Sequence, residues 1–103
     1  MPKRARIKVE GIDRGISLRI RHLKNYALRE PLDIVLEADE SGFLASSVDL
    51  PLYGYGHDMI EAIDMLKEEI ERVYEELSKD NNFTEDWLKT KSFLNKVIET
   101  NHG

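Results

Sequence analysis

The stretch that decides the fold is residues 32–77, LDIVLEADESGFLASSVDLPLYGYGHDMIEAIDMLKEEIERVYEEL. Leu32, Ile34 and Leu36 alternate with Asp33, Val35 and Glu37, and a second strand-like run follows over 43–48, after the turn-forming residues 38–42. This pattern predicts an antiparallel β-hairpin. Pro51 ends the second strand, because proline cannot donate to a central ladder. The glycine–aromatic residues 52–56 then predict a short strand or a loop.

A long helix is predicted over about residues 58–79. Asp58 precedes the periodic run and Glu61 follows three residues later, which is an aspartate version of the capping box. Apolar residues recur at helical spacing and indicate a core-facing stripe: Ile63, Leu66, Ile70, Val73 and Leu77. The opposite face is acidic and carries Glu61, Asp64, Glu68, Glu71 and Glu75. The stripe is interpreted as core, with helix pairing in a homodimer as the lesser alternative.

Working outward, the sequence predicts one more hairpin and one more helix. Period-two alternation on both sides of a turn at 12–15 predicts strands at about 4–12 and 15–23. Thr84 caps a second helix of about 85–100, whose apolar stripe is Trp87, Leu88, the Lys91 stem, Leu94, Val97 and Ile98. We expect an α+β fold in which an antiparallel sheet of about four strands packs against one long helix, with a second C-terminal helix.

Composition sets the class of protein. A chain of 103 residues suits one domain with one core. Because it has no cysteine, thiolate catalysis, disulfides and cysteine zinc sites are excluded. Its apolar runs are too short for a membrane span, and its N-terminus does not resemble a signal peptide. A cytoplasmic protein with no membrane association is therefore expected.

The net charge of −5 is unevenly distributed: residues 1–30 carry a net +6, and residues 31–103 carry a net −11. The basic side chains that would share one face of the first hairpin are Arg6, Lys8, Arg19 and Arg21. They could contact nucleic-acid phosphates, or they could form a solvated face that discourages edge aggregation. No aromatic residue is interleaved with them in the sequence, so a stacking platform is missing. A basic part joined to an acidic part suggests charged partners or self-association.

No residue pattern carries a recognisable catalytic site. His22, His57 and His102 have no ligand-like neighbour three or four residues away. The Gly54-x-Gly56 pattern is interpreted as turn geometry, not as a phosphate loop. Acidic residues near the strand ends could hold magnesium in a nuclease, although a solvated face is favoured: Asp33, Glu37, Asp39, Asp49 and Asp58. We expect no enzyme activity, no cofactor and no metal.

Motifs in residues 34–77 have the order and spacing of a known family. They are Ile34-Val35-Leu36-Glu37, Asp39-Glu40-Ser41-Gly42-Phe43, Asp49-Leu50-Pro51, Gly54-Tyr55-Gly56 and Glu61-Ala62. This run resembles HicB-like antitoxins. The resemblance implies that residues 1–103 form a single HicB-like domain with a degraded RNase-H-like fold. It also implies direct neutralisation of a small RNA-cleaving toxin of the HicA type.

The favoured hypothesis is a HicB-like, non-catalytic protein-binding module, in which the acidic face covers the basic surface of such a toxin. Homo-oligomers such as dimers are expected as well. The candidate partner-binding residues are Tyr53, Tyr55, Glu61, Asp64, Glu68 and Glu71. The alternative is a nucleic-acid-binding protein that uses the basic hairpin. The last hypothesis is a metal-dependent nuclease that relies on Asp33 or Asp49.

Overall fold

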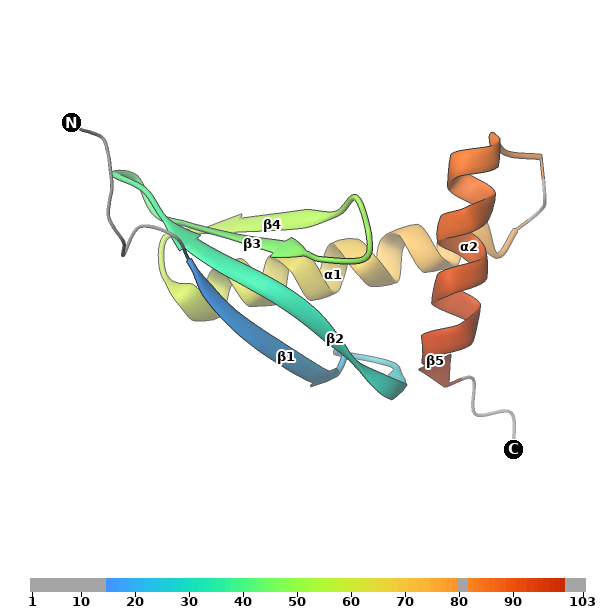
Figure 1. Cartoon of the computed structure of the whole chain (residues 1–103), viewed down its shortest axis with the longest axis horizontal. Helices are drawn as coiled ribbons and strands as arrows, with labels where there is room; N and C mark the ends of the chain where they lie inside the picture. Colours follow the sequence, from blue (N-terminus) through green and yellow to red (C-terminus); the bar gives the residue numbers. More distant parts are fainter. Residues whose placement is uncertain (1–14, 80–81, 100–103) are drawn as a thin grey trace.

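A computed structural model describes residues 15–79 and 82–99. It shows an antiparallel sheet with two helices, so the α+β class predicted from the sequence is confirmed. The elements in chain order are β1 (Ile16–His22), β2 (Ala27–Ala38), β3 (Phe43–Ser47), β4 (Tyr53–Gly56), α1 (Met59–Leu77), α2 (Glu85–Val97) and β5 (Ile98–Glu99). In Figure 1, α1 runs behind the sheet along the long axis, and α2 lies across the end where α1 finishes.

The sheet is a meander in the order β1-β2-β3-β4, and β5 pairs with the start of β2. The predicted β2–β3 hairpin is confirmed, with Leu36 opposite Ala45. β2 begins earlier than predicted and runs through Pro31. The β1–β2 register shifts between Ile20 and His22, opposite Pro31. Proline has no N–H for this ladder, which accounts for an irregularity at that point.

The second predicted strand of the N-terminal hairpin exists as β1, and it joins the main sheet by pairing with β2. Leu18 lies opposite Ile34 and Ile20 opposite Leu32. The first predicted strand, at about 4–12, lies outside the described residues, as do Arg6 and Lys8.

The predicted helix over about 58–79 is α1, and its capping is as expected at Asp58. The Asp58 carboxylate accepts a hydrogen bond of 2.8 Å from the Glu61 N–H. Glu61 accepts in return from the His57 N–H at 2.7 Å, one residue before the cap. The first bond occupies an N–H group that a helix start leaves without an intrahelical partner, and the second holds the residue that leads into the cap.

The core lies between α1 and one face of the sheet. Its centre comprises Ala62, Leu66 and Ile70 from α1 and Leu32, Ile34, Leu36 and Ala45 from the sheet. α1 lies directly on β4, because Gly54 and Gly56 face it. A Cβ at Gly54 would stand 2.7 Å from the Ala62 carbonyl oxygen. The two glycines therefore serve close packing within a strand. The short strand predicted for residues 52–56 is confirmed, and the interpretation of Gly54-x-Gly56 as turn geometry is wrong.

The C-terminal helix is shorter than predicted. α2 ends at Val97, and Ile98 and Glu99 pair with Leu28 and Ala27 as β5. Leu94, Val97 and Ile98 are buried as expected. The expectation that Trp87 and Leu88 belong to the buried stripe is wrong, since 39% and 37% of their surfaces are exposed. They lie in the first turn of α2, away from β2.

Candidate functional site

The predicted partner-binding residues lie on two separate surfaces. Gly54 and Gly56 face α1, and strand residues alternate between the two faces of a sheet. Tyr53 and Tyr55 therefore point to the opposite side, where no helix among the described residues covers the sheet. The acidic residues Glu61 and Asp64 lie on α1, on the other side of the sheet. No single patch contains both groups.

The uncovered side, called here the open sheet face, consists of Val35, Leu44, Ser46, Tyr53 and Tyr55 with their neighbours in register. Tyr53 lies opposite Ser46 and Tyr55 opposite Leu44. The exposed fraction is 65% for Tyr53 and 43% for Tyr55. Exposed aromatic side chains over a partly apolar sheet are features of interaction surfaces.

Asp39 organises the end of the open sheet face at the β2–β3 turn. Its carboxylate accepts hydrogen bonds from the N–H groups of Ser41 at 2.7 Å and Gly42 at 2.8 Å, and from the Tyr55 hydroxyl at 3.1 Å. The two N–H groups hold the pKa of Asp39 below its usual value. Desolvation, followed by the bond to Asp39, raises the pKa of Tyr55. This carboxylate therefore has a structural role in the turn.

The second surface is the acidic helix face, defined by Glu61, Asp64, Glu68 and Glu75 on the outward side of α1. The β1–β2 turn reaches this face. Lys24 donates to Glu68 at 2.6 Å, and the Tyr26 hydroxyl donates to Glu75 at 2.8 Å. The bond to Glu68 raises the pKa of Lys24, and the bond to Glu75 raises the pKa of Tyr26 to about 12.

Glu71 is a correction to the expected site. The sequence places it on the exposed acidic side, but only 6% of its surface is exposed. It accepts hydrogen bonds from the backbone N–H and the side-chain amide of Asn25, at 2.6 and 2.8 Å. A buried carboxylate is stable when it is hydrogen-bonded in this way. Glu71 therefore belongs to the fold and not to an exposed surface.

Sequence reasoning missed the role of the β1–β2 turn. Lys24, Asn25 and Tyr26 lie between the predicted strands of about 15–23 and 32–37, where the sequence predicts no element, and their partners are more than 40 positions away in the chain. The only local signal was the polar character of these residues between two strands. No periodicity in the sequence connects them to α1.

The predicted basic residues are divided between described and undescribed parts of the chain. Arg19 and Arg21 are exposed on β1, and Arg19 pairs with Asp33 through Nε and Oδ1 at 3.0 Å. By strand alternation both arginines lie on the same side of the sheet as Tyr53 and Tyr55. The sheet therefore places basic and aromatic residues on one face, although β1 and β4 form its opposite edges.

The candidate metal-binding carboxylates have other partners or lie apart. Asp33 pairs with Arg19, Asp39 holds the turn, and Asp58 caps α1. Over residues 15–79 and 82–99 no group of three or more His, Asp or Glu side chains is arranged to hold a metal ion. His57 is exposed and its Nδ1 lies 3.5 Å from the Glu61 carboxylate.

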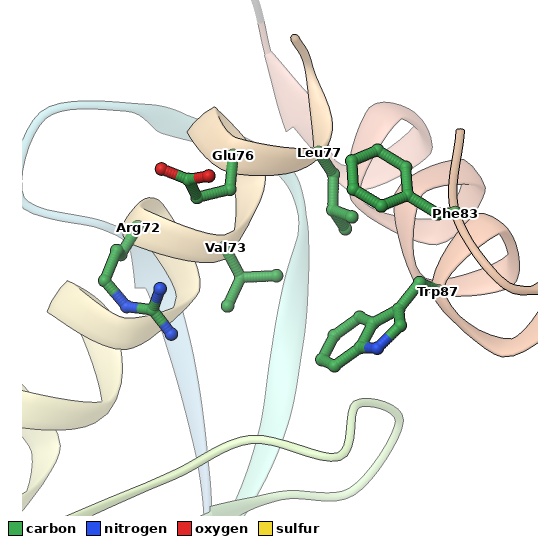
Figure 2. Close-up of a pocket in the computed structure, with 6 residues that line it drawn as sticks. All are labelled: Arg72, Val73, Glu76, Leu77, Phe83 and Trp87. Carbon is green, nitrogen blue, oxygen red and sulfur yellow. The ribbon is translucent and has the colours of Figure 1, made fainter. Parts of the chain in front are cut away.

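A small groove lies between α1 and the start of α2. Figure 2 shows the rings of Phe83 and Trp87 beside Val73 and Leu77, with Arg72 and Glu76 also lining the groove. Its volume is about 190 Å³. Arg72 bonds both carboxylate oxygens of Glu69, at 3.1 and 2.8 Å, which lowers the pKa of Glu69. The guanidinium at this groove is thus already paired within α1.

Comparison with protein-family models, curated proteins and solved structures gave no match. In the described part of the chain, neither helix combines the length and the apolar character required to cross a bilayer. The open sheet face and the acidic helix face are therefore the two candidate functional surfaces.

Proposed function

We propose that the protein is a non-catalytic, HicB-like binding module that neutralises a small basic partner, such as a HicA-type RNA-cleaving toxin. The observation that carries this proposal is the exposed outward side of α1. Residues 58–79 contain eight acidic and three basic side chains, a net charge of −5 on one helix, and every acidic side chain among them except the buried Glu71 reaches solvent. Such a surface attracts a basic partner and accelerates its association.

The N-terminal half of α1 is the best candidate for direct contact. Here Asp64 and Glu61 lie beside large apolar side chains that reach solvent. The exposed fraction is 73% for Ile60 and 42% for Met65. Apolar anchors within a charged rim are typical of protein interfaces, where the anchors supply most of the binding free energy. The C-terminal half differs, because Lys24 and Tyr26 already contact its carboxylates.

Capture of a basic partner tests this proposal. The purified chain should recover a small basic protein from the native lysate, and the complex should weaken as salt rises. Asp64→Lys with Ile60→Ser should weaken capture by about tenfold or more, because the pair removes one charge contact and one anchor. Glu30→Lys, an exposed charge reversal on β2, is the matched control. Equal capture by both variants would contradict the proposal.

Nucleic-acid binding is the second candidate. The observation in its favour is that Arg19 and Arg21 share a sheet face with Tyr53 and Tyr55, a combination that suits single-stranded nucleic acid. It predicts a salt-dependent gel shift that Arg21→Glu weakens. A shift that Arg21→Glu leaves unchanged would remove these residues from consideration.

A further inference from the structure

The open sheet face has an apolar middle. Val35 is half-buried there, while Tyr53 and Val48 are 65% and 58% exposed. Leu44 lies opposite Glu37, nearer the β2–β3 turn. Val48 joins this face beside Ser17, Arg19 and Asp33, with which it lines a shallow depression. No described residue covers these side chains. A patch of this kind favours contact with a second surface over contact with water.

The two ends of this face carry opposite charges. Arg21 of β1 and Arg29 of β2 lie toward the end where β1 finishes and β2 begins, and the Arg19–Asp33 ion pair lies midway along the face. Glu37, Asp39 and Glu40 lie at the other end, around the β2–β3 turn. From Arg29 to Glu37 the strand rises by about 26 Å, at roughly 3.3 Å per residue. The face is thus basic at one end, apolar in the middle and acidic at the other.

We propose that a second copy of this chain docks on the open sheet face. The two sheets stack face to face about a two-fold axis that lies between them and runs across the strands. This rotation reverses the strand direction, so the basic end of each copy lies over the acidic end of the other. The apolar middles then meet. Such an interface is isologous, which means that both copies use the same surface. Because each sheet is twisted, the strands of the two copies cross at about 30°.

Charge distribution is the reason for choosing a second copy as the occupant. A uniformly basic protein would match the acidic end and meet like charge around Arg21 and Arg29. A nucleic acid would match the basic end and meet like charge around Glu37 and Glu40. A copy of the same face in reversed orientation matches both ends at once. This surface is separate from the acidic helix face, so both can be occupied together.

Paired charge reversals test the proposal. One variant carries Arg21→Glu and Arg29→Glu, and the other carries Glu37→Lys and Glu40→Lys. Both leave the Arg19–Asp33 pair and the Asp39 turn intact. Wild type should sediment as a dimer at about 100 µM, a concentration at which even modest self-affinity is visible. Each variant alone should dimerise at least about tenfold more weakly, because its two ends then have the same sign.

The decisive measurement is the mixture. An equimolar mixture of the two variants should form a heterodimer, because every reversed end then faces its opposite. Lys89→Glu with Lys96→Glu on α2 is the control and should dimerise as wild type does. Circular dichroism establishes that each variant is folded. Val48→Ser with Tyr53→Ser should also weaken the dimer, through the apolar middle.

Three results would overturn the proposal: a wild type that stays monomeric at this concentration, reversals that dimerise unchanged, or a mixture that forms no heterodimer. A monomeric wild type whose RNA binding is lost in Arg21→Glu/Arg29→Glu would assign the basic end to nucleic acid instead. A monomeric wild type that still captures a basic protein would overturn the dimer and leave the proposed function standing.

Discussion

The buried Glu71 carboxylate accepts two hydrogen bonds from Asn25, one from the backbone N–H and one from the side-chain amide. The two residues are 46 positions apart, and their contact attaches the β1–β2 turn to the outward side of α1. On either side of it, Lys24 bonds Glu68 and Tyr26 bonds Glu75. One turn thus engages three acidic residues along the helix and removes part of its negative charge from solvent.

Glu71→Ala should lower the free energy of unfolding by about 2 kcal/mol, because it removes the buried carboxylate that accepts two part-buried hydrogen bonds from Asn25. Glu71→Gln should cost less, since its amide oxygen can still accept one bond. Urea unfolding measures both losses. Glu76→Ala, on the exposed side of the same helix, is the control and should change stability by less than about 0.5 kcal/mol. Equal losses for Glu71→Ala and Glu76→Ala would contradict the role assigned to Asn25.

Tyr26 should ionise at a higher pH than an ordinary tyrosine, with a pKa of about 12 against a usual 10.0, because its hydroxyl donates to Glu75. A group whose pKa is raised by folding stabilises the native state fully below its unfolded pKa. That contribution is lost as the pH rises from about 10 to about 12. Phenolate absorbance during an alkaline titration measures the ionisation. In Tyr26→Phe this late-titrating group should disappear; an unchanged titration curve would refute the assignment.

Gly54→Ala should destabilise the protein by about 3 kcal/mol or more, since a Cβ there collides with the backbone of α1 at Ala62 and Leu66. Backbone atoms cannot rotate away as a side chain can, so the helix must move off β4. The midpoint of thermal unfolding reports the loss. Ser46→Ala, on the open sheet face opposite Tyr53, should have little effect. A Gly54→Ala protein as stable as wild type would show that α1 does not lie this close to β4.

Truncations in α2 should distinguish its buried end from its exposed start. Leu94→Ala should cost about 3 kcal/mol, because Leu94 is fully buried beside Val97 and Ile98. Leu88→Ala should cost less than about 1 kcal/mol, given its 37% exposure. Denaturant unfolding compares the two. A larger loss at Leu88 would favour the continuous apolar stripe that the sequence predicts over the packing described here.

Local patterns in the sequence were enough to predict the fold class. Three local patterns carry this prediction: the alternation over 32–37, the turn residues 38–42 and the cap at Asp58. Each depends on a few neighbouring residues, so a short window of sequence is enough to predict the local structure. The same patterns placed β3 and α1 close to their observed bounds, whereas β2 begins earlier, at Ala27. Whether Tyr53 and Tyr55, the candidate partner-binding tyrosines, reach solvent or close the core could not be predicted from these patterns; in the structure both are exposed.

Tertiary structure alone decided how these residues combine. It buried Glu71 under Asn25, made a strand of Ile98 and Glu99, and separated the tyrosines from the acidic helix face. It also placed Arg21 and Tyr53 on one side of the sheet, although they come from its two opposite edge strands. Each result depends on which distant segments pair and in which register. Register and helix docking follow from packing of the whole core, which no short window of sequence contains.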